Sequence, residues 1–201
     1  MGTGRAAGED CLECRDWPSV LTRARYAFVL TPPATDLVHG LKYEGWRELA
    51  GPMGRAMAAV LDRSFGEDDG PDRQKSIVVP VPTTDRRSRQ RGYNQARLLA
   101  AEVASRVGSS HSDALTRVRA AASQTELAPW ARRENVRGVF TCSEEGARTV
   151  SGMDVVLVDD VLTTGATAGE AAGELGRAGA RTVTLLAFAR ALPRVVLRDA
   201  A

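Results

Sequence analysis

The stretch from Val155 to Thr167 constrains the fold more than any other part of this 201-residue chain. It begins with the aliphatic run Val155–Val158, which is typical of a strand buried on both faces of a parallel sheet. Two acids, Asp159 and Asp160, end this run, and a short loop and then a helix follow. This order places both acids at the carboxyl end of a parallel strand, where open α/β sheets bind ligands.

The loop after the acids is suited to binding an anion. It consists of Thr163, Thr164, Gly165, Ala166 and Thr167. Its hydroxyl and backbone N–H groups lie at the positive end of a helix, and its glycine allows an anion to approach the backbone closely. Acids that can hold vicinal hydroxyls beside a phosphate cradle predict a site for a ribose 5-phosphate. The alternative is an ordinary strand–turn–helix corner whose acids and threonines only cap, and Thr167 and Glu170 do have the spacing of a capping box.

The bulk composition places the chain among globular proteins. Hydrophobic residues make up 43% and charged residues 26% of the sequence, in the range of an ordinary soluble domain. The chain has neither an apolar run of the ~20 residues that span a bilayer nor the apolar segment of a secretory signal, so we expect a cytoplasmic protein. The net charge of +2 excludes bulk electrostatics as a basis for binding nucleic acid.

The cysteines do not predict a disulfide framework, because there are only three of them. Cys11 and Cys14 form a CxxC pair, which is half of a tetrahedral zinc site. Cys142 lies far away in the sequence, and His39 and His111 are isolated. We therefore do not expect a complete zinc site within this chain.

Strands alternate with helices from residue 76 onward, which predicts an α/β fold with a mainly parallel sheet flanked by helices. We divide the chain into a flexible N-terminal segment (1–18), an N-terminal hood or helical region (19–75), a core (76–190) and a C-terminal tail (191–201). The predicted strands are 24–30, 77–81, 115–118, 139–141, 154–158 and 181–189, and the predicted helices are 46–65, 93–107 and 166–178, with a short helix between Pro33 and Gly45.

A second candidate site follows the strand that ends at Val81. The next residues are Thr83, Thr84, Asp85 and Arg86, and further arginines follow in what reads as a loop. Backbone N–H groups, with Arg86 or Arg87, are suited to receive a pyrophosphate. The alternative is a solvated, arginine-rich turn.

The polar stretch 120–137 has weak periodicity and is long enough to be a functional loop. Gln124, Arg132 and Arg133 are the residues that we expect on a lid closing over a reacting centre. A plain exposed connection is the alternative.

The whole string from Val155 to Thr167 resembles the phosphoribosyl-pyrophosphate (PRPP) signature of type I phosphoribosyltransferases. At finer grain the chain resembles the ComF/GntX family of bacterial proteins, which carry a domain with this fold. The matching elements fall in order between about residues 26 and 190. Besides the PRPP string they are His39–Gly45, Val79–Pro82, Arg91-Gly92-Tyr93-Asn94-Gln95-Ala96, Gln124-Thr125 and Arg133–Phe140.

The resemblance implies a type I phosphoribosyltransferase-like fold and binding of PRPP, with Mg²⁺, at Asp159, Asp160 and the threonine loop. It also implies a role in DNA uptake during competence or in nucleotide metabolism, with single-stranded DNA or uptake proteins as partners, and homodimers are common in this fold. Members of the family often begin with a four-cysteine zinc module. This chain has only Cys11 and Cys14 of such a module, so zinc and any partner recruited by the module are in doubt.

Three functions remain open from the sequence. The first is an enzyme that transfers a phosphoribosyl group from PRPP to an unidentified acceptor. The second is a PRPP- or nucleotide-sensing protein that uses its arginine-rich loops on nucleic acid. The third is an interaction module of the DNA-uptake machinery with a vestigial site. The fold alone cannot decide between these functions. The predicted lid favours the enzyme, because a sensor needs no closing loop.

Overall fold

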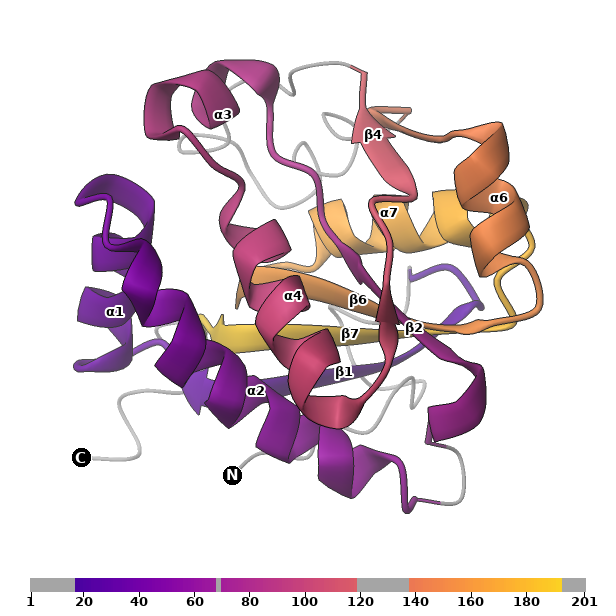
Figure 1. Cartoon of the computed structure of the whole chain (residues 1–201), viewed down its shortest axis with the longest axis horizontal. Coiled ribbons are helices and arrows are strands. Elements are labelled where there is room, and N and C mark those ends of the chain that lie inside the picture. Colours follow the sequence, from indigo (N-terminus) through magenta and orange to yellow (C-terminus); the bar gives the residue numbers. More distant parts are fainter. Residues whose placement is uncertain (1–16, 68–69, 119–137, 193–201) are drawn as a thin grey trace.

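The computed structural model describes residues 17–67, 70–118 and 138–192 (Figure 1). Its main sheet has five strands in the order β1-β7-β6-β2-β3, and all neighbouring strands are parallel. The α/β class with a mainly parallel sheet is thus confirmed. The strands are β1 (Leu21–Val29), β2 (Ser76–Pro80), β3 (Ser110–His111), β6 (Asp154–Leu162) and β7 (Thr182–Arg190).

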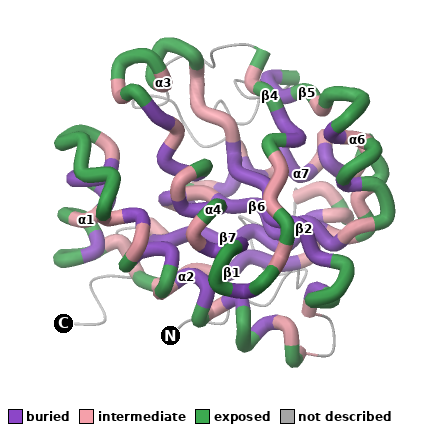
Figure 2. Tube along the Cα trace, in the orientation of Figure 1, coloured by how far each residue is buried: buried purple, intermediate pink, exposed green. Residues whose placement is uncertain are grey.

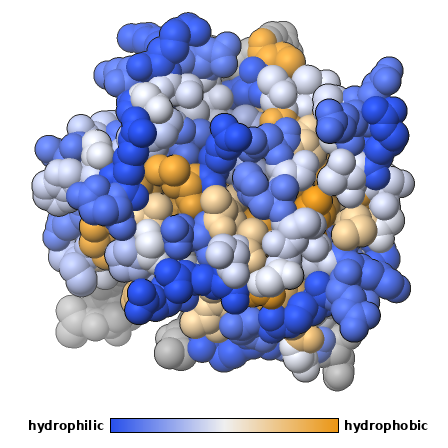
Figure 3. Space-filling model, viewed as in Figure 1, coloured by the Kyte–Doolittle hydropathy of each residue, from blue (hydrophilic) through white to orange (hydrophobic). Residues whose placement is uncertain are grey.

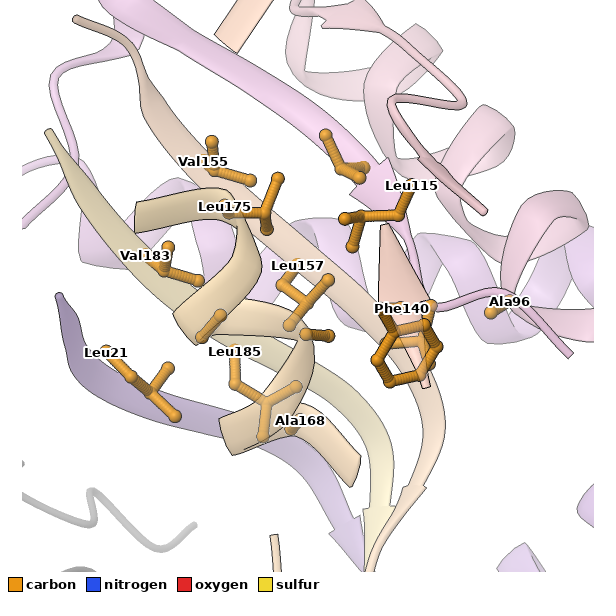
Figure 4. Packing of buried hydrophobic residues seen from close by; sticks show 14 of the residues in the cluster. Leu21, Ala96, Leu115, Phe140, Val155, Leu157, Ala168, Leu175, Val183 and Leu185 are labelled. Carbon is orange, nitrogen blue, oxygen red and sulfur yellow. The ribbon is translucent and has the colours of Figure 1, made fainter. Parts of the chain in front are cut away.

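Helices cover both faces of this sheet. Helices α2 (Ala50–Ser64) and α4 (Gln95–Val107) share one apolar cluster with Val156 and Val158 of β6. Helix α7 (Ala166–Arg177) covers the other face, where Leu157 of β6 belongs to a second cluster (Figure 4). The aliphatic run is therefore buried on both faces, and each such side chain stabilises the fold by roughly 1.5–3 kcal/mol.

The remaining elements lie at the margins of the sheet. They are α1 (Ala34–Tyr43), the 3-10 turns η1 (Arg47–Leu49) and η2 (Arg73–Lys75), α3 (Asp85–Arg91), α6 (Glu144–Val150), and β4 (Leu115–Arg117) paired antiparallel with β5 (Phe140–Cys142). Figure 2 shows α3 largely exposed, α1 with both buried and exposed residues, and the central strands buried. None of the helices in the described ranges has the length and apolar character needed to cross a membrane.

The range 19–75, which the sequence predicts as an N-terminal hood, shares the main sheet with the predicted core. Strand β1 pairs with β7 at the edge of the sheet, and α2 packs beside α4 on its face. Within this range α1 and η1 lie at the margin of the sheet, although Val38 and Leu41 of α1 belong to the apolar cluster on that face. Figure 1 shows α1 beside the ends of the central strands.

The predicted end of the central strand is wrong. Strand β6 continues through both acids to Leu162, because Asp159, Val161 and Leu162 pair with β7. The neighbouring β2 ends earlier, at Pro80, which pairs with Val158. The acids therefore extend past the end of β2, and one side of β6 opens at this point.

The predicted arginine-rich loop is also wrong, because residues 85–91 form helix α3. Thr84 is its N-cap, and its Oγ1 accepts a hydrogen bond from the backbone N–H of Arg87 at 3.2 Å. The helix ends at Gly92, whose φ of 77° is in the left-handed region that glycine adopts without strain. The arginines are thus presented by a short capped helix.

Asp154, at the start of β6, joins three segments and should be essential for stability. It is 1% exposed, and its carboxylate accepts hydrogen bonds from the backbone N–H of Asp72 (2.7 Å), from Arg181 (2.5 Å) and from the hydroxyl of Thr182 (2.8 Å). Asp154→Ala removes a buried carboxylate and all three of its partly buried hydrogen bonds at once, so we expect the free energy of unfolding in urea to fall by about 3 kcal/mol. Asp113→Ala breaks an exposed pair with Arg97 and should cost under about 1 kcal/mol. Equal losses in the two variants would contradict this role.

Candidate functional site

A cavity of about 610 Å³ opens where β2 and β6 end. Its walls come from α1, the loop after β2, α3, the start of α4, β4, the end of β6 and the start of α7. The charged and polar residues that line it are Lys42, Tyr43, Thr83, Thr84, Arg86, Arg87, Gln90, Arg91, Asn94, Gln95, Arg117, Asp159, Asp160, Thr163 and Thr167. The surface over α3, at the upper left of Figure 3, is strongly hydrophilic.

A second cavity of about 40 Å³ adjoins the first and is formed by the threonine loop. All five predicted phosphate-binding residues, Thr163 to Thr167, line it. Asp159, Val161, Thr163 and Thr167 line both cavities. The structure therefore places the predicted phosphate loop and the predicted acids in the walls of two neighbouring cavities.

The threonine loop leaves the start of α7 without a side-chain cap. Gly165 is the N-cap with a φ of 74°, and no side chain there accepts a hydrogen bond from the helix. The predicted capping box of Thr167 and Glu170 is wrong, because Glu170 Oε1 instead accepts a hydrogen bond from the backbone N–H of Gly138 at 2.6 Å. Backbone N–H groups at the positive end of α7 thus remain available to an anion.

The two acids occupy different surroundings. Asp160 is 8% exposed, and its Oδ1 lies 2.8 Å from Nζ of Lys42, at the end of α1. Asp159 is half-buried, and its Oδ1 accepts a hydrogen bond from the backbone N–H of Asp160 at 2.8 Å. Burial, and then the negative charge of Asp160, raise the pKa of Asp159 to about 7, although Lys42 opposes this shift. A cation or hydroxyl donors supplied by a ligand would relieve this unfavourable charge.

The raised pKa of Asp159 predicts a pH-dependent stability. In the unfolded chain this aspartate ionises near pH 3.8, whereas in the folded protein it stays neutral until about pH 7. Its contribution to the free energy of unfolding is therefore fully present below pH 3.8 and is lost as the pH rises through about 7. Asp159→Asn cannot ionise and should therefore be more stable than the wild type, with a gain that grows between pH 5 and pH 8. Allowing for solvent screening at the cavity wall, we expect this growth to be about 1–2 kcal/mol.

Urea unfolding of the ligand-free protein at the two pH values measures this difference. Asp113→Asn, on the exposed surface, is the matched control and should behave as the wild type at both. A gain for Asp159→Asn that stays the same at pH 5 and pH 8 would show that Asp159 ionises normally.

The predicted pyrophosphate segment is only partly placed in the cavity wall. Thr83, Thr84 and Arg86 line it, whereas Asp85 is exposed on the first turn of α3 and is not part of the lining. Arg87, the other arginine proposed for this role, also lines the cavity.

Two basic residues of the cavity have no role in the sequence-based prediction. Arg117 comes from β4, and burial followed by the charge of Arg87 lowers its pKa, while Asp159 raises it. Lys42 belongs to the family-like segment His39–Gly45, and this position was the only signal that could have found it. Arg117 is a single arginine in a three-residue strand, and nothing in the sequence distinguishes it from a surface residue.

Several predicted residues lie outside the described residues. These are the lid residues Gln124, Arg132 and Arg133 and the half zinc site of Cys11 and Cys14. In the ranges that the structure does describe, no three His, Cys, Asp or Glu side chains are grouped to hold a metal ion. The lid range lies in sequence between β4 and β5. Arg117, the last residue of β4, lines the cavity and pairs with Phe140, the first residue of β5.

Known proteins resemble the chain in sequence over most of its length. DNA utilization protein YhgH of Salmonella typhimurium is 36% identical over 186 residues, which cover 90% of this chain and 78% of that protein. The protein of the same name from Escherichia coli K12 is 34% identical, with 88% and 74% covered. Competence protein F of Haemophilus influenzae is 31% identical over 115 residues, or 57% of this chain and 50% of that one.

Other comparisons add less. No protein-family model matches the chain. Among solved structures, the allosteric regulatory enzyme of purine biosynthesis overlaps with 75% of this chain and 30% of its own, with a TM-score of 0.46 and 17% identity, and a likeness at this level supports no conclusion. The sequence relatives are sufficient: the chain belongs to the family of DNA utilization protein YhgH and competence protein F, the ComF/GntX family.

Proposed function

We propose that this protein binds PRPP together with Mg²⁺ and transfers its phosphoribosyl group to an acceptor. One observation carries the proposal: paired acids, an uncapped helix N-terminus and four arginines line two cavities that share part of their walls. PRPP is a ribose with a phosphate at one end and a pyrophosphate at the other, so it requires these three kinds of group together.

The 5-phosphate would occupy the smaller cavity. Thr163 to Thr167 would surround it with hydroxyl and N–H groups at the positive end of α7. Asp159 and Asp160 border the next part of the space, where they can accept hydrogen bonds from the two ribose hydroxyls. The ion pair with Lys42 would hold Asp160 in place for this contact.

The pyrophosphate would extend towards Arg86, Arg87 and Arg117, since guanidinium groups bind phosphate oxygens in pairs. Asp159 and Asp160 offer the carboxylate oxygens that Mg²⁺ prefers, and two carboxylates suit an ion that completes its shell with substrate phosphates and water. When bound, Mg²⁺ neutralises charge on the pyrophosphate and makes it a better leaving group.

During transfer, the bond between C1 of the ribose and the pyrophosphate oxygen breaks, and the electron pair leaves with the pyrophosphate. The acceptor then donates an electron pair to C1, and the proton on its reacting atom is released to water. The side chains stabilise charge and hold the reactants in place: the arginines stabilise the leaving anion, and the two carboxylates face the cation-like ribose. No covalent step requires a side-chain nucleophile.

The second candidate is a PRPP-binding protein that acts with nucleic acid and catalyses no transfer. Arg86, Arg87 and Arg89 are exposed on α3 and could contact phosphates. The relatives carry names that refer to DNA utilization and competence. The names of these relatives are the sole basis on which we propose a role in handling DNA for this chain. Its location in the cytoplasm stays a prediction.

Release of pyrophosphate separates the two candidates. The protein is incubated with PRPP, Mg²⁺ and each member of a panel of nucleobases, and pyrophosphate is measured. We expect release that depends on one acceptor and that is absent in Asp159→Asn/Asp160→Asn. Tight binding of PRPP without release with any base would favour the binding protein.

A further inference from the structure

Residues 91–96 connect the end of α3 to the start of α4, and Arg91, Asn94, Gln95 and Ala96 form one wall of the cavity. The hydroxyl of Tyr93 donates a hydrogen bond to the carbonyl of Leu41 in α1 at 2.6 Å. Asn94 is the N-cap of α4, and its Nδ2 donates to the carbonyl of Val81 at 3.1 Å. These bonds connect α1, the end of β2 and α4, so the wall is fixed before any ligand binds.

Gln95 contributes an unpaired donor to this wall. It is 2% exposed, it lines the cavity, and its Oε1 accepts a hydrogen bond from Nη1 of Arg91 at 2.9 Å. Because a guanidinium group has only donors, this bond fixes the orientation of the amide. Its Nε2 is then buried without a hydrogen-bond partner among the described residues. A buried donor without a partner is unfavourable, and an acceptor atom on a ligand would relieve it.

Tyr43 supplies an aromatic surface in the same cavity. It lines the cavity at the end of α1, yet 66% of its surface is exposed. The guanidinium carbon of Arg91 lies 5.0 Å from the centre of its ring, and the ring of His39 flanks it at 5.0 Å with a tilt of 43°. Arg91 thus contacts both the tyrosine ring and the glutamine amide, and joins them into one surface.

We propose that Tyr43, Arg91 and Gln95 form the acceptor subsite, which takes a planar heterocycle that stacks on Tyr43 and accepts a hydrogen bond from Gln95 Nε2. This assignment rests on the proposed function, because it concerns the second substrate of the same cavity. A ring nitrogen or a carbonyl group is the acceptor atom such a heterocycle offers. The subsite explains why the Arg91–Ala96 segment has this composition: the arginine orients the glutamine, while the tyrosine and asparagine fix the wall.

The test measures the binding of free nucleobases by calorimetry, with the full chain and saturating ribose 5-phosphate and Mg²⁺, a mixture that carries no pyrophosphate leaving group and so allows no transfer. We expect at least one base to bind.

Tyr43→Leu should weaken the binding of that base by roughly tenfold through loss of stacking. Gln95→Met keeps the size of the side chain and removes the donor, and should weaken binding by roughly fivefold or more. Tyr43→Phe, which keeps the ring, should lose much less than Tyr43→Leu. The nucleoside of the same base should bind more weakly than the free base, because an acceptor must present an unsubstituted ring nitrogen to C1.

Two matched controls stand outside the cavity lining. Phe28→Leu removes an exposed aromatic ring from β1, and Gln74→Met replaces an exposed glutamine on η2. Both should bind bases as the wild type does, and circular dichroism with urea unfolding establishes that every variant is folded. If Gln95→Met does not fold, Gln95→Glu provides the second variant: it keeps the bond to Arg91 but presents no N–H donor, and it should weaken binding similarly.

The outcomes separate this inference from the proposed function. Binding of a base that Tyr43→Leu and Gln95→Met leave unchanged overturns the subsite, as does PRPP binding without binding of any base. In both cases the PRPP site stands. Failure of PRPP itself to bind overturns the proposed function, while binding of a base that depends on Tyr43 and Gln95 would still support the subsite.

Discussion

Replacement of Asp159 and Asp160 by asparagine should strongly weaken PRPP binding while the protein remains folded. The two carboxylates are the acceptors proposed for the ribose hydroxyls, and hydrogen bonds to charged groups are the strong ones. Loss of two such interactions should weaken binding by roughly 100-fold or more, as measured by calorimetry with PRPP and Mg²⁺. Removal of the charge on Asp159 also removes the free-energy cost of burying that charge. The loss of PRPP binding should therefore come without a large loss of stability from this position.

The matched control is Asp62→Asn/Asp113→Asn, which removes the same charge from two exposed positions outside the cavity lining. It should bind PRPP as the wild type does. Single variants then separate the two acids: Asp160→Asn loses its ion pair with Lys42 and should be the less stable of the two. Undiminished PRPP binding in Asp159→Asn/Asp160→Asn would rule out a direct contact between these acids and PRPP.

Gly165→Ala should damage both stability and PRPP binding. The φ of 74° at this position is costly for alanine. A Cβ atom would also lie 2.8 Å from the ring of Trp17, which is not part of the lining of either cavity. We expect the free energy of unfolding to fall by about 2–4 kcal/mol, and PRPP affinity to fall more than tenfold because the loop must shift.

Gly169→Ala, one turn along the same helix, is the control for this change. Its Cβ would find Pro18 at 3.7 Å, an ordinary contact, and its backbone is helical. This variant should be as stable as the wild type or more stable by up to about 1 kcal/mol. It should bind PRPP unchanged. The same behaviour in both glycine variants would contradict the proposed role of the loop conformation.

The sequence allowed the burial of the central strand β6 to be predicted, but not the length of that strand. The aliphatic run of β6 has a clear pattern, and its burial on both faces is confirmed. Its continuation through Asp159 and Asp160 depends on hydrogen bonds to β7, a strand some twenty residues later in the chain. Two adjacent acids locally disfavour a strand, and only the partner strand overrides that preference.

The arginine-rich segment shows a different limit. Its arginines gave no apolar stripe, and therefore no helical period could be recognised. The helix α3 exists because of its ends: Thr84 caps the start, and Gly92 allows the turn at the end. Cap residues with polar residues between them also occur in loops, so a reading based on hydrophobic periodicity predicts a loop here.

The parts of the site that the sequence missed come from long-range contacts. Lys42 reaches Asp160 across more than a hundred residues, and Arg117 reaches the cavity from a separate small sheet. Glu170 fits the spacing of a capping box but bonds to Gly138, because the chain after the lid range returns to this helix. Local spacing could not predict any of these partners.

The central claim is that a sugar phosphate binds where β6 meets the threonine loop, and calorimetric titration of the full chain with PRPP and Mg²⁺ tests it most directly. We predict one PRPP bound per chain, with ribose 5-phosphate competing for the site and unphosphorylated ribose failing to compete. Absence of any binding of PRPP and ribose 5-phosphate to the folded protein would contradict the account.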